Sequence, residues 1–117
     1  MTMPLATHAA DVPAVFADRF NSGDLAAVGE VYETGALMGD EHGRGVAGAD
    51  LLAVLRGHMA FGLPITVTPR KVFETGGIAL LVVDWAIGDI RGTATDVARR
   101  GPDGYWRYLI DNPFGTA

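Results

Sequence analysis

The closing stretch Asp103-Gly104-Tyr105-Trp106-Arg107-Tyr108-Leu109-Ile110-Asp111-Asn112-Pro113-Phe114-Gly115 decides the fold of this chain. Its Asp-Gly pair is a strong hairpin signal, because both residue types tolerate the backbone of a tight turn between antiparallel strands. The residues after the turn alternate in character until Asn-Pro ends the run, since proline cannot donate to a strand ladder. The stretch therefore predicts that the chain finishes on a strand.

Three further β-rich runs precede this strand, at residues 65–74, 78–87 and 91–100. Gly76-Gly77 and Gly88-Asp89 separate them, and such pairs are typical of hairpin turns. The four runs predict an antiparallel meander. In residues 78–87 both strand faces are apolar, which predicts that one face covers helices and the other lies at a subunit contact or is partly exposed.

The first half of the chain has helical spacing. Asp11 and Pro13 predict the start of a helix that runs to residue 21, and Ser22-Gly23-Asp24 predicts a break and a new cap before a second helix, which includes Tyr32 and ends at Gly35. A third helix follows a cap at Ala49-Asp50, after a short strand at residues 36–40 and a polar glycine turn at residues 41–45. We expect a single α+β domain over residues 1–117, with helices in the concave face of a curved, mostly antiparallel sheet and a pocket at one open end.

Composition narrows the range of functions. The 117 residues are 49% hydrophobic, with a mean hydropathy of +0.21, which is ample for one packed core. The net charge of −5 and pI near 4.9 argue against nucleic acid as a partner, because nucleic-acid binders need clustered basic residues. The absence of cysteine, of a basic leader and of a bilayer-length apolar run predicts a cytoplasmic protein without a membrane partner.

The chain resembles the nuclear transport factor 2-like superfamily, which has a cystatin-like cone fold. Residues 23–40 and 96–104 are most similar to steroid delta-isomerases, and residues 106–115 are more similar to SnoaL-like polyketide cyclases. The resemblance implies that Asp40 is a general base and that Asp96 is a protonated acid that binds an oxyanion. The third catalytic position falls on Phe16, which cannot donate a hydrogen bond, so Tyr32 or Trp85 would have to supply the missing donor.

Each of these acids also has a structural interpretation. Asp40 can cap the turn into the glycine loop, and Asp96 can pair with Arg91 or Arg99 on the sheet. Asp84 stands alone in an apolar strand, so it is either a third candidate acid or a structural residue on the opposite sheet face. Because successive side chains of a strand point to opposite faces, we expect Asp84 on one face of the sheet and Trp85 on the other.

Further residues are candidates for lining a ligand cavity. On the last strand, parity places Trp106, Tyr108 and Ile110 on one face and Asp111 on the other, and such an aromatic stripe is either core or cavity wall. Arg99 and Arg100 point to opposite faces, so only one of them can enter the cavity, where it would clamp a carboxylate or pair with Asp96. The complete set of predicted ligand-binding residues is Phe16, Met59, Trp85, Arg99, Trp106, Tyr108, Asp111 and Asn112.

Two functions follow from this pattern. The first is a SnoaL-like enzyme that needs no cofactor and carries out acid-base isomerisation or cyclisation of a small apolar carbonyl compound, with Asp40 as base. The second is a module that binds an apolar small molecule without catalysis, or that only dimerises. We expect a homodimer in either case. The three histidines are scattered, so no metal site is predicted.

Overall fold

The computed structural model describes residues 2–116 and is an α+β domain, as the sequence predicts. Its helical elements are η1 (Ala9–Asp11), α1 (Val12–Ser22), α2 (Leu25–Gly29) and α3 (Gly48–Met59). Its strands are β1 (Tyr32–Gly39), β2 (Gly45–Val46), β3 (Ile65–Thr75), β4 (Ile78–Ile87), β5 (Ile90–Arg100) and β6 (Trp106–Asp111).

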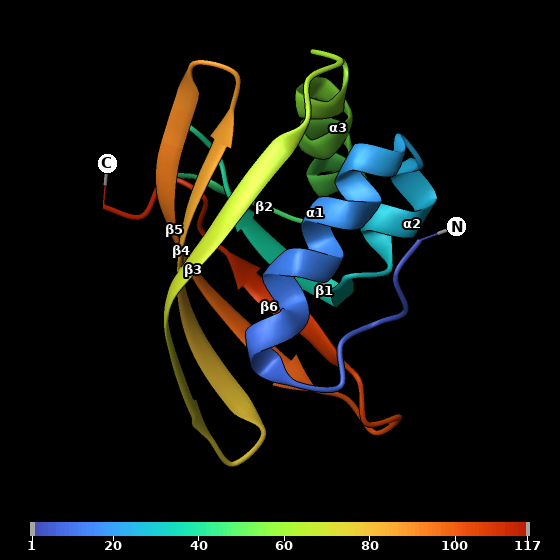
Figure 1. The fold of residues 1–117 in the computed structure, drawn as a ribbon, viewed down its shortest axis with the longest axis vertical. Helices are drawn as coiled ribbons and strands as arrows, with labels where there is room; N and C mark the ends of the chain where they lie inside the picture. The colour runs from blue at the N-terminus through green and yellow to red at the C-terminus, as the bar shows by residue number, and fades with distance from the viewer. Residues whose placement is uncertain (1, 117) are drawn as a thin grey trace.

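Within residues 2–116 the strands form one six-stranded sheet of order β2-β1-β6-β5-β4-β3. The predicted meander of β3 to β6 is confirmed, and β1 extends it by pairing with β6 in parallel, while every other pair is antiparallel. The sheet curves around α1, and the helices lie on one of its faces (Figure 1). Among the described residues no helix lies on the other face, so a single layer of strands separates the core from the outside.

The break between the first two helices is confirmed. Gly23 ends α1 in the left-handed region, with φ of 78°, where a side chain would be strained. Asp24 then caps α2, because its Oδ1 accepts hydrogen bonds from the backbone N–H groups of Ala26 and Ala27 at 3.0 and 3.3 Å. The predicted side-chain cap of α3 is wrong, since Ala47 occupies its N-cap position without a side-chain bond.

The second helix is shorter than predicted. It ends at Gly29, and Tyr32 opens β1 opposite Tyr108 of β6. A helix of one turn has little intrinsic stability, so pairing with the sheet decides the conformation of Tyr32. Gly35 does not end a helix; it lies inside β1 with φ of 82°, where the register with β6 shifts.

Two side chains fix the C-terminal end of α1 to its surroundings. The amide of Asn21 donates to the backbone oxygen of Ile65 at 3.0 Å and accepts from its N–H at 2.8 Å, which ties the end of α1 to the start of β3. The buried guanidinium of Arg19 donates to the backbone oxygens of Ala27 and Met3 and to Glu30. These bonds satisfy a charge that would otherwise be costly to bury.

The core lies between the helices and the inner face of the sheet. On β4, Ala79, Leu81 and Val83 are buried there, while Ile78 and Leu80 are exposed on the outer face. The predicted alternation of this strand is therefore confirmed. Within residues 2–116 no helix is both long enough and apolar enough to cross a membrane.

Candidate functional site

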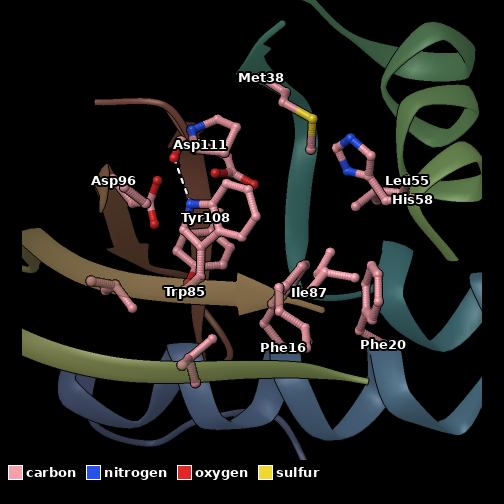
Figure 2. Close-up of a pocket in the computed structure, with 15 residues that line it drawn as sticks. Phe16, Phe20, Met38, Leu55, His58, Trp85, Ile87, Asp96, Tyr108 and Asp111 are labelled. Atoms are coloured by element: carbon pink, nitrogen blue, oxygen red, sulfur yellow. Dashed lines mark hydrogen bonds between the residues drawn. The ribbon is translucent and has the colours of Figure 1, made fainter. Parts of the chain in front are cut away.

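A cavity of about 50 Å³ lies at one end of the core, between the helices and the inner face of the sheet. Phe16 and Phe20 of α1 and Leu55 of α3 form its apolar walls, together with side chains of β3 and β4. Two carboxyl groups, Asp96 and Asp111, face this apolar space (Figure 2). An apolar lining with a few convergent polar groups is the usual composition of a ligand site.

The two carboxyl groups form a hydrogen-bonded pair. Asp96 lies on β5 and Asp111 at the end of β6, and their side chains are hydrogen-bonded to each other. The hydroxyl of Tyr32 donates to Asp111 Oδ2 at 2.6 Å, and the backbone N–H of Asn112 donates to Asp96 Oδ1 at 2.9 Å. Both acids are buried.

We interpret the two acids as sharing one proton, because burial raises the pKa of both of them. Among the described residues that line the cavity there is no lysine or arginine. Burial raises the pKa of Asp96 well above its ordinary value, and the charge of Asp111 and the hydrogen bond to it raise that pKa further. Burial also raises the pKa of Asp111, whereas the hydrogen bonds from Asp96 and Tyr32 lower it. Asp96 is therefore the neutral donor and Asp111 the acceptor of the pair.

A bulge in β6 brings Asp111 into the cavity. Ala98 pairs with Tyr108 and Val97 with Ile110, so Leu109 is the extra residue between them. Tyr108 and Asp111 consequently both face inward, and Ile110 is exposed on the outer face. The predicted parity of this strand is wrong from Leu109 onward, because simple alternation does not include a bulge.

Trp85 forms the wall of the cavity nearest the chain's end. Its indole N–H donates to the backbone oxygen of Pro113 at 2.6 Å, and its ring meets that of Phe114 edge to face at 6.0 Å. The ring lies across Gly92, where a Cβ atom would come within 2.7 Å of it. Because its donor is occupied, Trp85 contributes an apolar surface and does not replace the donor that Phe16 lacks.

The hydroxyls of Tyr32 and Tyr108 are the phenolic donors near the pair. Tyr32 is bonded to Asp111, and Tyr108 lines the cavity itself. Burial raises the pKa of both phenols well above the ordinary value, and the nearby carboxyl groups raise it further. Both phenols therefore keep their protons at neutral pH.

A second hollow of about 550 Å³ adjoins the cavity on the outside. It runs between the C-terminal half of α3, the β1–β2 loop and the β4–β5 hairpin, and its apolar walls include Phe61, Ile90 and Phe114. We call it the outer groove. His58, Trp85 and Ile87 line both the cavity and the outer groove, so they lie between the two spaces, and we call this place the neck.

Asp40 lies at the rim of the outer groove and not in the cavity. Its Oδ1 accepts the backbone N–H groups of His42 and Arg44 at 2.9 and 2.8 Å, so it caps the turn of the glycine loop. The bond from Arg44 is the main reason that the pKa of Asp40 is lowered. The structure therefore does not bring Asp40 and Asp96 together, and it supports the structural interpretation of Asp40.

Of the residues predicted to bind a ligand, Phe16, Trp85, Tyr108 and Asp111 line the cavity. Arg99 does not, because it points to the outer face and binds Glu33 through two nitrogens at 2.6 and 2.9 Å. It therefore does not pair with Asp96.

Three other predicted residues lie outside the cavity lining. Met59 ends α3 and is partly buried against the core, and Trp106 is buried beside Ala6, with which it forms a bridge. The side chain of Asn112 binds Thr95 and the backbone of Gly115, behind Asp96.

The sequence reasoning missed several apolar residues that line the cavity, such as Phe20 and Met38, and it also missed the titratable side chain of His58. With Leu51 and Leu55 it follows the i, i+4, i+7 spacing that marks the buried face of a helix. Both leucines are buried, and His58 continues their row to the end of α3. That spacing was a signal that the histidine faces inward.

Comparisons with known proteins identify the fold. No family model matches the chain, and no curated protein matches it. Solved structures do match this chain. One is a proposed ketosteroid isomerase from Shewanella frigidimarina, which is 19% identical in sequence with a TM-score of 0.69, and the match covers 92% of this chain and 96% of that one.

Two further structures agree with this fold. A proposed dehydratase of the NTF2-like family from Streptomyces avermitilis is 17% identical with a TM-score of 0.69, covering 90% and 91% of the two chains. A proposed calcium/calmodulin-dependent protein kinase type II association domain from Thiobacillus denitrificans is 20% identical with a TM-score of 0.74, covering 96% and 99%. The chain thus has the nuclear transport factor 2-like, cystatin-like fold, as its sequence predicts.

Proposed function

We propose that this protein catalyses proton transfer on a small apolar carbonyl compound, without a cofactor, in the cavity at Asp96 and Asp111. The observation that carries the proposal is that these two buried carboxyl groups face one apolar space, which has no lysine or arginine among its described lining residues and raises the pKa of both acids. Acids kept neutral in this way can donate a hydrogen bond to a developing oxyanion, and ketosteroid isomerase is the standard example.

The chemistry follows from the arrangement of the pair. When a proton leaves the carbon beside a carbonyl group, negative charge develops on the carbonyl oxygen. The proton of Asp96 can turn from Asp111 to this oxygen, while Tyr32 continues to hold the charge of Asp111. The apolar walls of Phe16 and Phe20 strengthen these interactions by excluding water. The names of two structural neighbours, a proposed isomerase and a proposed dehydratase, are compatible with such chemistry.

The test uses 2-tetralone, a neutral bicyclic ketone, as a probe. Proton transfer is measured by NMR as exchange of its α-hydrogens for deuterium in D₂O, with the rate in buffer alone subtracted. Asp96→Asn should lower kcat about 100- to 1,000-fold, the usual effect of losing an oxyanion donor. Asp111→Asn should also lower kcat, because Asp111 accepts the hydrogen bond that holds the Asp96 proton in place. Asp84→Asn, the same change on the opposite sheet face, should leave the rate unchanged.

Circular dichroism establishes that each variant is folded. If wild-type protein binds 2-tetralone but does not accelerate exchange, the catalytic proposal is wrong and the cavity serves binding alone. If Asp84→Asn lowers the rate as much as Asp96→Asn does, the carboxyl pair has no special role.

A separate observation favours a homodimer. Apolar side chains occupy successive paired positions across the outer face of the sheet, and we call this row the outer stripe: Leu37, Ile110, Val97, Leu80 and Phe73. Four of them are 40–60% exposed. A row of this length is typical of an interaction surface.

The charges beside the outer stripe suit a second copy of the same chain. Arg99 with Glu33, and Arg70 with Asp84, form ion pairs on this face. Because both signs are present, a two-fold contact can place positive groups of one copy against negative groups of the other. We propose that two copies associate through the outer stripe.

A further inference from the structure

The proposed function requires a group that takes the proton from carbon, and neither aspartate of the pair suits this task. Asp96 holds a proton, and Asp111 already accepts hydrogen bonds from Asp96 and from Tyr32. Burial raises the pKa of Asp111 overall, but these two hydrogen bonds counteract that rise and occupy the carboxylate oxygens that would have to reach a substrate. The base must therefore be a different residue at the cavity.

Asp40 does not meet this requirement. Two backbone N–H groups bind its carboxylate and lower its pKa, which makes it a weak base. Asp40 also lines only the outer groove and does not line the cavity that holds Asp96. A proton acceptor at that position is separated from the oxyanion donor by the neck.

We propose that His58 is the catalytic base and that it removes the proton from the substrate on the side of the cavity opposite the Asp96–Asp111 pair. This inference rests on the proposed function and extends it. His58 lies at the neck, where it lines both the cavity and the outer groove. Its ring points from α3 toward the strands that carry the pair (Figure 2). A substrate that enters through the groove passes this ring.

The surroundings of His58 suit a base at neutral pH. Burial lowers the pKa of the imidazole, so the ring is neutral and has a free lone pair. The charges of Asp111 and Glu41 oppose this shift, and no hydrogen bond contributes to it. Asp40 and His42 also line the groove that His58 borders. The negative charge of Asp111 stabilises the imidazolium ion that forms when His58 accepts a proton.

The step balances as a reversible transfer within one substrate. A ring nitrogen of His58 forms a bond to the α-hydrogen, the C–H bond breaks, and its electron pair moves into an enolate. The enolate oxygen accepts the hydrogen bond of Asp96. If the imidazolium ion returns its proton to a conjugated carbon, the carbonyl is restored and the substrate is isomerised. If it first exchanges that proton for a deuteron of the solvent D₂O and then returns the deuteron to the same carbon, the result is the exchange that the assay measures.

The experiment measures kcat and KM for deuterium exchange into 2-tetralone. His58→Gln should lower kcat about 100-fold or more, the usual share of a general base, with a smaller change in KM. Free imidazole should restore part of the rate in His58→Ala. His8→Gln is the matched control, because His8 is exposed near the N-terminus and should behave as wild type.

The pH profile separates a base from a structural residue. In wild-type protein, kcat should rise with pH through a pKa below about 6.5, as His58 loses its proton. This acid limb should disappear in His58→Gln. It should remain in Asp40→Asn, which should also keep the wild-type rate.

Two outcomes would overturn the inference alone. If Asp96→Asn abolishes exchange while His58→Gln keeps both the rate and the acid limb, the proposed function stands and the base is another group. If Asp40→Asn loses as much activity as His58→Gln, then the base is not His58 by itself. Absence of exchange in the wild-type protein would instead reject the proposed function and this inference together.

Discussion

Asp84 and Asp96 lie on neighbouring strands of the sheet but on opposite faces, and their partners differ. On the outer face, Asp84 accepts a hydrogen bond from the hydroxyl of Thr93 at 2.7 Å and lies 3.6 Å from the guanidinium of Arg70. On the inner face, Asp96 is buried against a second acid. The neighbouring cation compensates the charge of Asp84, so a structural role explains this acid. A buried acid that is paired with another acid keeps its proton, and that proton is available for chemistry.

The two faces also differ in what covers them. The inner face is covered by α1 and α3, with the small cavity between them and the strands, and the outer face has no covering element within residues 2–116 (Figure 1). The outer stripe is nevertheless apolar. We therefore expect that a second copy covers the outer face and that a ligand fills the inner one.

The largest effect should come from placing a charge in the outer stripe. Leu80 is 43% exposed at the centre of that row. Leu80→Glu would place two like charges in a desolvated two-fold interface, which costs several kcal/mol, so the dimer should dissociate about 100-fold more readily. Sedimentation velocity should show the mass of a dimer for wild-type protein and of a monomer for this variant.

Leu63→Glu is the matched control for that experiment. Leu63 is 49% exposed but lies in the loop between α3 and β3, away from the outer stripe. This variant should remain dimeric. If wild-type protein sediments as a monomer at micromolar concentration, the outer stripe is not an interface between copies.

A smaller effect is expected from Gly92 on the inner face. A methyl group there would come within 2.7 Å of the Trp85 ring, which the bond to Pro113 holds in place. Gly92→Ala should therefore lower the free energy of unfolding by about 1–3 kcal/mol, as overpacking does. Chemical denaturation followed by tryptophan fluorescence measures this change.

The opposite sign is expected at Gly57. Nothing lies within 4 Å of a Cβ atom placed there, and the residue is inside α3. Gly57→Ala should raise the free energy of unfolding by about 0.5–1 kcal/mol through helix propensity. If Gly92→Ala and Gly57→Ala changed the free energy of unfolding by the same amount in the same direction, the Trp85 ring would not restrain β5 at Gly92.

The same inner face shows how far the sequence alone could lead. Glycine pairs predicted the hairpins, and parity correctly placed Asp84 and Trp85 on opposite faces of β4, because that strand is regular over the relevant residues. Parity failed on β6, where the bulge at Leu109 turns Asp111 inward. A bulge depends on how two strands fit together and leaves no strong signal in either one.

The remaining site residues show two other limits. The local spacing of apolar residues predicts a helix through Tyr32, because local spacing cannot show that a distant strand, β6, pairs with this residue. The inward position of His58 is predictable from the sequence, since its spacing from Leu51 and Leu55 is local. The resemblance to isomerases correctly indicated the fold, but the position of Asp40 depends on the backbone of the loop that its carboxylate caps.

The last prediction separates Asp96 from Asp40 by the sign of the pH dependence of stability. Burial raises the pKa of Asp96 above its value in the unfolded chain, about 3.9. Between these two pKa values the native protein binds more protons than the unfolded chain, so stability falls as pH rises. Asparagine carries no such proton. The Asp96→Asn variant should therefore gain stability over wild type as pH rises from 4 to 8, by at most about 1.4 kcal/mol per pH unit.

Asp40→Asn should show the opposite dependence. Hydrogen bonds lower the pKa of Asp40, so its contribution to stability is present above the unfolded pKa and is lost as pH falls through the folded one. This variant should be less stable than wild type at neutral pH, and the difference should shrink in acid. Thermal unfolding from pH 3 to 8 measures both variants. A stability difference for Asp96→Asn that does not change with pH would mean that Asp96 holds no extra proton in the folded protein, and the shared-proton interpretation of the pair would then be wrong.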